Sequence, residues 1–265
     1  MKFTKMHGLG NDYIYVYAKE VPANAEELSR KLSERRFGIG SDGMIWILPS
    51  DKADFEMRIF NADGSEAKMC GNGIRCVGKY VYDKGFTDKK DITVDTLSGI
   101  KTLKLIVKDG KVTDATVGMG KSRVEKPVTL SACGKEVACV PVDMGNPHAV
   151  IFTDDAENAP LTTVGAGLEH NPFFPDGVNV EFVKILSEHE IRMRVWERGS
   201  GITAACGTGA CASVSAAVKA GRCLENEDIT VFLDGGKLTV RTDHDGSVTM
   251  SGPAETVFEG EVSDD

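Results

Sequence analysis

The sequence predicts an α+β fold made of two similar domains. Short runs of β-branched and aromatic residues outnumber the helical segments, and glycine turns join several of these runs into hairpins. One spaced motif also occurs twice along the chain. Many strands with few helices are typical of an α+β fold and not of a doubly wound parallel sheet.

Strands are expected where a short apolar run ends at a turn. Two hairpins are the clearest, because Asp109-Gly110 and Asp234-Gly235-Gly236 each separate two such runs. The first turn is expected to be of type I′, in which both central residues have positive φ. The predicted strands are residues 13–17, 44–48, 55–60, 101–108, 111–117, 229–233, 237–241 and 247–250.

Three segments are predicted to be helical. Ala25 to Arg36 has leucines at an i, i+4 spacing among charged residues. The other two helices follow Cys70 and Cys206 and are expected to end at Gly85 and Gly221. A glycine just past a helix end readily adopts the left-handed conformation that closes the helix.

The two halves of the chain repeat one spacing. Arg58 and Arg194 each lie twelve residues before a cysteine, Cys70 or Cys206, and each cysteine is followed by Gly-x-Gly and by a glycine fifteen residues on. Upstream, a Gly-Asn pair and an Asp-Gly pair recur in the same order. We therefore expect two duplicated domains, residues 1–117 and 118–265, related by a pseudo-twofold axis. That arrangement would bring the two cysteine turns face to face across a cleft.

Composition and charge argue against nucleic-acid-binding, membrane and secreted proteins. The 265 residues carry a net charge of −9, so the phosphate backbone of nucleic acid is an unfavourable partner. No apolar run approaches the length needed to span a bilayer, and no basic run indicates a membrane surface. The first residues do not resemble a signal peptide, and seven cysteines are an odd count for a disulfide framework. A cytoplasmic protein with mostly free thiols is expected.

A cysteine followed by Gly-x-Gly at a helix start indicates a reactive thiol beside an anion-binding site. Unpaired backbone N–H groups there carry partial positive charge, which favours a thiolate and binds anions such as a carboxylate. A thiol pKa of about 8.5 can fall to about 3.5–7.5 at such a position. Two facing turns would offer a base and an acid on opposite sides of a carbon atom, which suits inversion of an amino acid at its α-carbon.

Other interpretations of these residues remain open. Cys206 and Cys211 fall within a loose zinc spacing, but no second ligand pair accompanies them. The Cys-Gly-x-Gly turns match neither the P-loop nor the dinucleotide-binding pattern, so no nucleotide or pyridoxal phosphate is indicated. A protein of redox or zinc-binding function is the alternative to an enzyme. The five cysteines other than Cys70 and Cys206 are expected to be structural; they are Cys76, Cys133, Cys139, Cys211 and Cys223.

Several polar residues near the turns are candidates for binding a substrate. Glu197 could pair with an ammonium group and Arg198 with a carboxylate, while His148 could orient a substrate. Asparagine at a turn is usually structural, which leaves both roles open for each asparagine. The asparagines that lie beside turns or strand ends are Asn11, Asn61, Asn72, Asn146 and Asn179.

Six motifs in order resemble the diaminopimelate epimerase family. They are His7-Gly-Leu-Gly-Asn-Asp12, Asn61-Ala-Asp-Gly-Ser-Glu66, Met69-Cys-Gly-Asn-Gly-Ile-Arg-Cys76, Gly145-Asn-Pro-His148, Gly177-Val-Asn-Val180 and the segment from Glu197 to Cys211. Proline racemases share the two-cysteine plan but usually carry histidine where this chain has Asn72. The asparagine favours the diaminopimelate branch, and a monocarboxylate isomerase on the same fold is the weaker alternative.

The resemblance implies a specific enzyme. The family interconverts LL- and meso-diaminopimelate in lysine and cell-wall precursor synthesis, without pyridoxal phosphate or metal. It implies that Cys70 and Cys206 act as acid and base, that Glu197 and His148 assist, and that the protein is a homodimer of two-domain chains in which each antiparallel sheet wraps a central helix. The substrate contacts that it implies fall on Asn11, Asn61, Gly71, Asn72, Asn146, Asn179, Glu197, Arg198, Gly207 and Thr208.

Two positions depart from the family pattern. Many members carry glutamine where this chain has Gly43, so one distal substrate contact is in doubt unless the Gly43 backbone amide replaces it. Many members carry glutamate where this chain has Ile202, and we expect that change to affect the support of the second turn.

Overall fold

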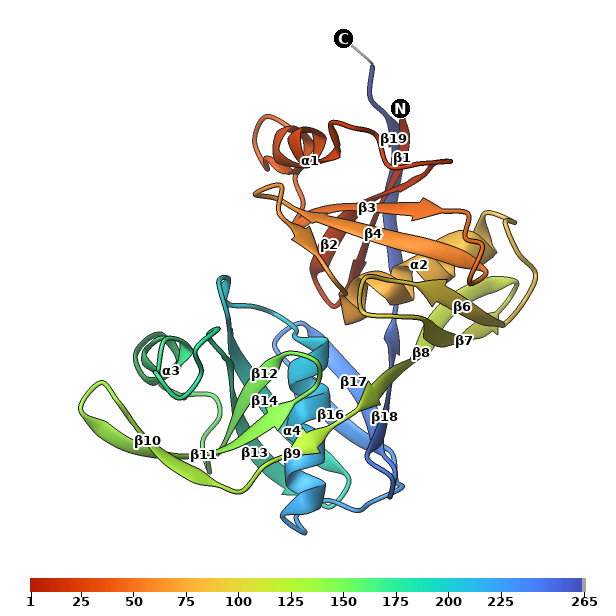
Figure 1. Cartoon of the computed structure of the whole chain (residues 1–265). Coiled ribbons are helices and arrows are strands. Elements are labelled where there is room, and N and C mark those ends of the chain that lie inside the picture. Colours follow the sequence, from red (N-terminus) through yellow and green to blue (C-terminus); the bar gives the residue numbers. More distant parts are fainter. Residues whose placement is uncertain (264–265) are drawn as a thin grey trace. The chain divides into compact units, whose positions relative to one another are not determined.

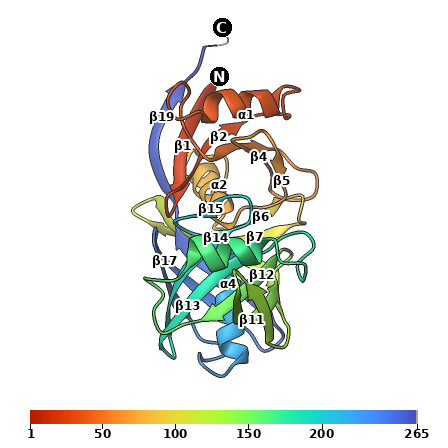
Figure 2. The ribbon, with the colours of Figure 1, turned by 90° about the vertical axis from the view of Figure 1, so that its left-hand side faces the viewer.

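The computed structural model describes residues 1–263 and divides the chain into two compact units. Unit 1 contains residues 1–117 together with the C-terminal segment from Gly252, and unit 2 contains Gly118–Ser251. The predicted boundary after residue 117 coincides with this division, but the C-terminal segment was expected in the second domain. It belongs to unit 1 because β19 (Glu255–Glu261) pairs antiparallel with β1 (Lys2–Gly8), as Figures 1 and 2 show.

Unit 1 is a curved sheet with two helices. Its strands pair in the order β19-β1-β2-β3-β4-β6-β7-β8, and the short strand β5 is added to β4. The remaining elements are β2 (Asn11–Tyr17), α1 (Ala25–Ser33), β3 (Gly43–Leu48), β4 (Phe55–Asn61), β5 (Glu66–Ala67), α2 (Gly71–Asp83), β6 (Asp91–Asp95), β7 (Lys101–Lys108) and β8 (Lys111–Lys121).

Unit 2 repeats this plan. Its strands pair in the order β9-β11-β12-β13-β14-β16-β17-β18, with β10 added to β11 and β15 added to β14. The elements are β9 (Arg123–Val124), β10 (Val128–Ala132), β11 (Lys135–Asp143), β12 (Pro147–Phe152), the π-helical turn η1 (Leu161–Gly165), α3 (Ala166–Glu169), β13 (Asn179–Ser187), β14 (Glu190–Glu197), β15 (Gly201–Ile202), α4 (Gly207–Lys219), β16 (Ile229–Leu233), β17 (Gly236–Thr242) and β18 (Ser247–Pro253).

The α+β fold with two similar domains is confirmed, but the sheets are mixed and not antiparallel. In unit 1 the pairs β2–β3 and β4–β6 are parallel, and in unit 2 the corresponding pairs β12–β13 and β14–β16 are parallel. Each parallel pair is joined by a connection that contains a helix. Such a crossover returns the chain in the same direction, whereas a tight turn reverses it.

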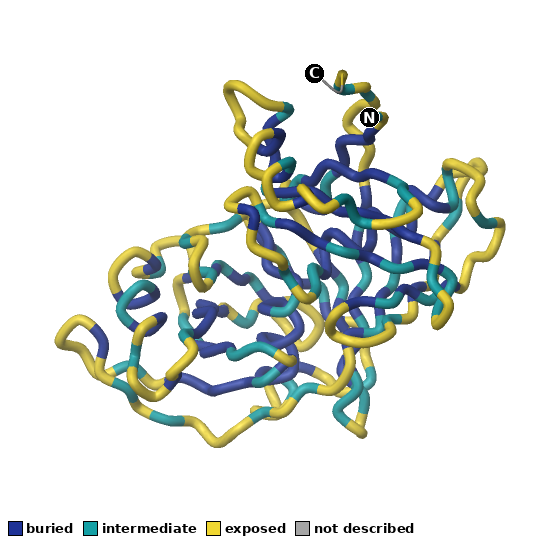
Figure 3. Tube along the Cα trace, turned by 45° about the horizontal axis from the view of Figure 1, so that its top comes forward, coloured by how far each residue is buried: buried dark blue, intermediate teal, exposed yellow. Residues whose placement is uncertain are grey.

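One helix lies at the centre of each unit. Helix α4 contacts β9 and β11 at one end of the strand order and β17 near the other, so the sheet of unit 2 curves around it (Figure 2). Its sequence consists mostly of glycine, alanine, serine and valine, whose small side chains allow this close approach. In unit 1, α2 packs against β1, β2 and β7, and a Cβ atom at Gly78 would lie 2.7 Å from Leu105. Figure 3 shows buried residues along these strands and helices and exposed ones in the loops.

The local predictions hold at the turns and differ at one helix end. Asp109 and Gly110 have φ values of 50° and 75°, as a type I′ turn requires. Helix α1 ends at Ser33 and not at Arg36, because the Leu32 carbonyl accepts hydrogen bonds from the N–H groups of residues 39 and 40. All eight predicted strands are present, but several others, among them β1, β13 and β14, were not predicted.

Within residues 1–263, no helix combines the length and the apolar character that crossing a membrane requires.

The C-termini of α2 and α4 supply a stability prediction. Gly85 and Gly221 have φ values of 75° and 66°, and nothing lies within 4 Å of a Cβ atom at either position. Gly221→Ala therefore adds left-handed strain without a clash and is expected to lower the free energy of unfolding by about 1 kcal/mol. Urea unfolding measures this. Gly221→Asn is the matched control and should cost less, because asparagine tolerates this conformation; an alanine variant as stable as the parent would contradict the assignment.

Candidate functional site

Cys70 caps the N-terminus of the central helix of unit 1. It has an extended backbone conformation, and its sulfur accepts a hydrogen bond from the N–H of Gly73 at 3.2 Å. Its side chain is half-buried. The thiol thus lies at the positive end of a helix of 13 residues, in the position where a serine or aspartate cap would normally lie.

One predicted asparagine contacts this sulfur, and a second predicted asparagine contacts the first. Asn11 begins β2, and its Oδ1 lies 3.2 Å from the Cys70 sulfur. Asn72 is buried in the first turn of α2, and its Nδ2 donates to the same Asn11 oxygen at 3.4 Å. The sequence motifs that contain Asn11 and Cys70 are therefore brought together by β2 and α2.

The side chain of Asn61 bonds within its own turn. It ends β4, and its Nδ2 donates to the hydroxyl of Ser65 at 3.1 Å. Its backbone N–H bonds to the Ser65 carbonyl and its carbonyl accepts from Gly64. In this structure Asn61 closes the turn between β4 and β5.

Cys206 occupies the corresponding position in unit 2. It is the N-cap of α4, and its sulfur accepts a hydrogen bond from the N–H of Gly209 at 3.3 Å. The two cysteines therefore have the same local geometry, but Cys206 is buried. The hydroxyl of Thr208 lies 3.7 Å from its sulfur.

A buried chain of polar side chains leads to this second cysteine. His148 is fully buried on β12, and its Nδ1 lies 2.7 Å from Oε1 of Glu181, which is also fully buried on β13. Its Nε2 lies 3.1 Å from Oδ1 of Asn146, whose Nδ2 donates to Thr208 at 3.3 Å. The chain Glu181–His148–Asn146–Thr208–Cys206 is continuous within unit 2.

Glu197 is the last residue of β14, and Arg198 follows it. Glu197 accepts a hydrogen bond from the Thr203 hydroxyl at 2.6 Å and also interacts with Cys206. Arg198 is exposed, and its backbone N–H donates to Oδ1 of Asn179 at 3.1 Å. The two neighbouring side chains therefore have different surroundings, because Glu197 is half-buried beside the thiol and Arg198 is exposed.

Burial dominates the electrostatics around Cys206. It raises the pKa of the Cys206 thiol well above its usual value, and the carboxylates of Glu197 and Glu181 raise it further. Hydrogen bonds from Gly209 and Thr208 act in the opposite direction and are outweighed. Burial also raises the pKa of Glu197. The expectation that a helix N-terminus lowers the thiol pKa is therefore wrong for Cys206, because loss of hydration disfavours the thiolate more than the helix stabilises it.

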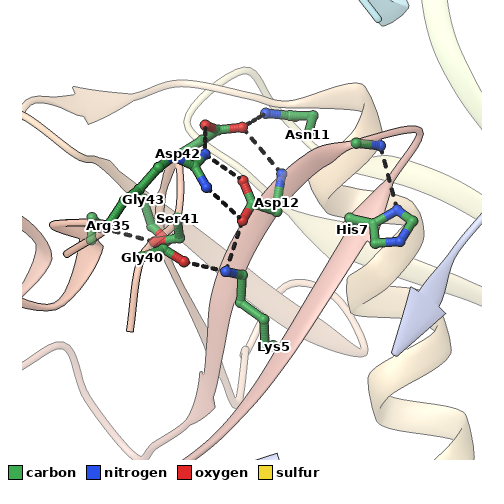
Figure 4. Close-up of polar contacts among 11 residues, drawn as sticks. Lys5, His7, Asn11, Asp12, Arg35, Gly40, Ser41, Asp42 and Gly43 are labelled. Carbon is green, nitrogen blue, oxygen red and sulfur yellow. Dashed lines mark hydrogen bonds and ion pairs between the residues drawn. The ribbon is translucent and has the colours of Figure 1, made fainter. Parts of the chain in front are cut away.

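Sequence reasoning missed two residues of these networks. Glu181 is a single carboxylate within an apolar strand, and this isolation was the available signal. A Cβ atom at Gly209 would lie 2.7 Å from its Oε1, so the carboxylate packs against the first turn of α4. Asp42 was noted only as part of a repeated dipeptide, yet its carboxylate accepts a hydrogen bond from Nδ2 of Asn11 at 2.8 Å (Figure 4).

The two departures from the family pattern lie in different surroundings. A Cβ atom at Gly43 would lie 2.2 Å from the carbonyl oxygen of Phe60, so this backbone cannot carry a glutamine. Ile202 pairs with Trp196 in the β14–β15 ladder, and its side chain is 47% exposed.

The other cysteines have structural surroundings. Cys76, Cys139 and Cys223 are buried, and burial raises the pKa of each thiol to about 11. Cys211 is buried within α4, while Cys133 is exposed on the β10–β11 turn. Across the described part of the chain, no group of three or more histidine, cysteine, aspartate or glutamate residues is arranged to hold a metal ion.

Two cavities lie outside these networks. One of about 560 Å³ in unit 1 is lined by residues that include Tyr80, Asp83 and Glu255, and one of about 440 Å³ in unit 2 by residues that include Arg192 and Phe232. The lining of both cavities lacks the residues predicted to bind or convert a substrate.

Comparison with known proteins identifies the family. The family model described as diaminopimelate epimerase matches residues 3–125 and 140–257. The chain belongs to the diaminopimelate epimerase family. The diaminopimelate epimerase of Phocaeicola vulgatus is 53% identical over 99% of this chain and 98% of its own length. That of Bacteroides thetaiotaomicron is 54% identical over 99% and 98%, and that of Methanococcus maripaludis is 48% identical over 99% and 99%.

Solved structures show the same fold at low sequence identity. A probable proline racemase from Agrobacterium radiobacter has a TM-score of 0.74 at 19% identity, covering 100% of this chain and 93% of that one. A phenazine biosynthesis protein from Bacillus anthracis has a TM-score of 0.73 at 16% identity, covering 99% of each chain. Family membership makes this chain an isomerase of the epimerase type.

The raised pKa of the Cys206 thiol predicts how a substitution of Glu197 affects the reactivity of this thiol. Glu197→Gln removes a negative charge beside Cys206, so the pH at which this thiol reacts should fall by about one unit. The rate of iodoacetamide labelling of the Cys206 peptide as a function of pH measures the change. Glu188→Gln is the control, since Glu188 acts on Cys223 and not on Cys206. A profile that Glu197→Gln leaves unmoved would contradict the assigned cause.

Proposed function

We propose that this epimerase interconverts LL- and meso-diaminopimelate by moving one proton with Cys70 and Cys206. The supporting observation is that each unit contains a cysteine-capped central helix with the same sulfur-to-glycine hydrogen bond, 3.2 Å in one and 3.3 Å in the other. Relatives over nearly the whole chain are diaminopimelate epimerases. The function places the protein in lysine and cell-wall precursor synthesis.

Inversion needs an acid and a base of similar strength. A thiolate would remove the α-proton on one face of the carbon, and the other thiol would deliver a proton to the opposite face. The mechanism therefore requires the two sulfurs on opposite faces of the substrate. Carbon–hydrogen bond cleavage at one thiolate yields a thiol, and protonation by the second thiol leaves a thiolate, so the enzyme ends with the same number of protons.

The carbanion between these steps needs electrostatic stabilisation. Backbone N–H groups in the first turns of α2 and α4, including those of Gly71 and Gly207, would donate to the substrate carboxylate as negative charge develops on it. Glycine at these positions lets the substrate approach the backbone closely. Fixed dipoles of this kind need no reorganisation during the reaction, which is why they suit a substrate whose α-proton is a weak acid.

The assisting groups of unit 2 follow from their surroundings. Glu197 would accept the proton of the Cys206 thiol, since it interacts with this cysteine and burial has raised its pKa, which makes it a better proton acceptor. His148 would hold Asn146 and through it Thr208 in place. Arg198 would pair with a carboxylate of the substrate.

The remaining contacts and the assembly are also part of the proposal. The proposed substrate-binding residues are Asn11, Asn61, Gly71, Asn72, Asn146, Asn179, Glu197, Arg198, Gly207 and Thr208. No pyridoxal phosphate or metal is required by this chemistry. We expect the enzyme to act as a cytoplasmic homodimer, which sedimentation of the purified protein measures.

The decisive experiment follows deuterium from solvent. When LL-diaminopimelate is converted in heavy water, a two-base enzyme places solvent deuterium at the α-carbon of the inverted product, because the protonating thiol exchanges with solvent. NMR or mass spectrometry of the product measures the label. Product without α-deuterium would contradict the mechanism, and turnover of proline but not of diaminopimelate would contradict the substrate.

Substitution of each cysteine tests its assigned role. Cys70→Ala and Cys206→Ala should each fold but lose at least about 100-fold in epimerisation rate, since each removes one of the two proton-transfer groups. Circular dichroism establishes folding and a coupled assay measures the rate. Cys133→Ala is the control, because that thiol is exposed on a hairpin turn, and it should keep full activity. Full activity in either of the first two variants would contradict the roles.

A further inference from the structure

A chain of hydrogen bonds in unit 1 determines which atom faces the Cys70 sulfur. It begins at Asp42, just before β3, and ends at Arg75 in α2. Two asparagine amides, Asn11 and Asn72, lie between these charged residues. Each amide has an acceptor oxygen and a donor nitrogen, so its neighbours decide which of the two faces the thiol.

At the first end, a carboxylate fixes Asn11. Asp42 Oδ2 lies 2.8 Å from one terminal atom of the Asn11 side chain, as Figure 4 shows. An ionised carboxylate only accepts hydrogen bonds, so that atom is the nitrogen Nδ2. The oxygen Oδ1 therefore points the other way, toward the Cys70 sulfur at 3.2 Å.

At the other end, a guanidinium fixes Asn72. Arg75 is fully buried and donates to Oδ1 of Asn72 at 3.0 Å, to the Gly71 carbonyl at 3.0 Å and to the Pro253 carbonyl at 3.1 Å. A guanidinium only donates, so the Asn72 atom that it contacts is the oxygen. The Asn72 nitrogen then donates to Asn11 Oδ1, which agrees with the orientation that Asp42 imposes.

Asp42 is itself held by a network of charges. Arg35 donates to Oδ1 of Asp42 at 2.8 Å and to both carboxylate oxygens of Asp12, at 2.9 and 3.3 Å. The buried Lys5 lies 2.7 Å from Asp12 and also bonds to the carbonyl of Gly40 (Figure 4). Burial would raise the pKa of Asp12, but hydrogen bonds from Arg35 and Lys5 outweigh it and hold that pKa below its usual value. These contacts keep the Asp12 carboxylate ionised at neutral pH, and Arg35 links it to Asp42.

We propose that Asp42 and Arg75 are positioning residues that align the Asn11 and Asn72 amides and thereby make the Cys70 sulfur a hydrogen-bond donor. A sulfur that faces an amide oxygen at 3.2 Å must carry a proton to form a hydrogen bond there, so Cys70 rests as the thiol. The inference rests on the proposed function, in which Cys70 is one of the two proton-transfer groups. It names Cys70 as the acid in the enzyme before substrate binds.

Two tyrosines and a second cysteine of unit 1 lie close to Cys70. Tyr13 on β2 forms side-chain hydrogen bonds with Cys70 and Asn11, and the hydroxyl of Tyr15 donates to the Gly73 carbonyl at 3.3 Å. Burial raises the pKa of both tyrosines well above its usual value. Burial likewise raises the pKa of Cys76 to about 11. Of the charged groups, Arg75 and Asp42 form the ends of the amide chain. The two phenols and the Cys76 thiol therefore keep their protons at neutral pH.

The test measures how Cys70 ionises. In a Cys206→Ala background of the full chain, iodoacetamide labels Cys70 as a function of pH, and peptide mass spectrometry separates it from the exposed Cys133. Asp42→Asn frees the Asn11 amide to turn its nitrogen toward the sulfur. A donor at this position favours the thiolate, so the midpoint of the labelling profile should fall by about one pH unit.

Two further variants test whether Asp42 acts on Cys70 by positioning Asn11 or through its own charge. Glu26→Gln removes an exposed carboxylate of the same unit that pairs with Arg30, and it should leave the midpoint unchanged. In an Asn11→Ala background, Asp42→Asn should cause no additional shift, because Asp42 acts through Asn11. A shift that persists in this background would show that charge alone acts, and an unmoved midpoint in Asp42→Asn itself would equally overturn the proposal.

A second variant tests the proposal if Asp42→Asn does not fold. If thermal unfolding shows that Asp42→Asn is not folded, Asn11→Ala alone carries the test, because it removes the acceptor that favours the thiol. Its midpoint should also fall, and an unchanged midpoint would overturn the proposal. The labelling experiment needs no diaminopimelate, so a parent enzyme without epimerase activity would contradict the proposed function but not this result.

Discussion

The N-terminus of a buried helix is the constraint on which the rest of each unit depends. Wrapping a sheet around a helix hides the helix from water, and its first N–H groups must then find acceptors within the protein. In both units a cysteine sulfur accepts one of them, from Gly73 in α2 and from Gly209 in α4. The residue that satisfies the helix N-terminus is therefore also a thiol placed at the positive end of a helix.

The side chains around the cysteine differ between the two units. In unit 1 the polar chain beside the cysteine runs between charged groups, and its amide oxygen faces the sulfur of Cys70. In unit 2 the chain begins at a buried carboxylate, Glu181, and passes through His148 to Thr208, whose hydroxyl lies near the sulfur of Cys206. Duplicated backbones thus carry unlike surroundings.

Three glycines near these networks leave no room for a Cβ atom. A Cβ atom at Gly209 would meet the Glu181 carboxylate at 2.7 Å, and one at Gly73 would meet Ile45 at 2.6 Å. At Gly43 the obstacle is backbone, the carbonyl of Phe60. The first two positions keep the helix start close to its surroundings. The third explains why a glutamine at this position is incompatible with the backbone of this chain.

The sequence by itself determined the elements and the repeat. Local signals such as Asp109-Gly110, or the glycines that end α2 and α4, depend on backbone preferences of a few residues, and the structure follows them. The repeated spacing around Cys70 and Cys206 likewise predicted two similar domains with cysteine-capped helices. Motifs that match a family predicted its activity, because each is a short stretch whose residues act together.

Tertiary structure decided what distant residues do to one another. The strand β19 joins unit 1 although it lies at the far end of the chain, since pairing with β1 depends on contacts across more than 240 residues. The burial of Cys206 and its two carboxylate neighbours reversed the pKa expected from a helix N-terminus, because desolvation depends on everything packed around the sulfur. The roles of Glu181 and Asp42 emerged only when strands placed them beside His148 and Asn11.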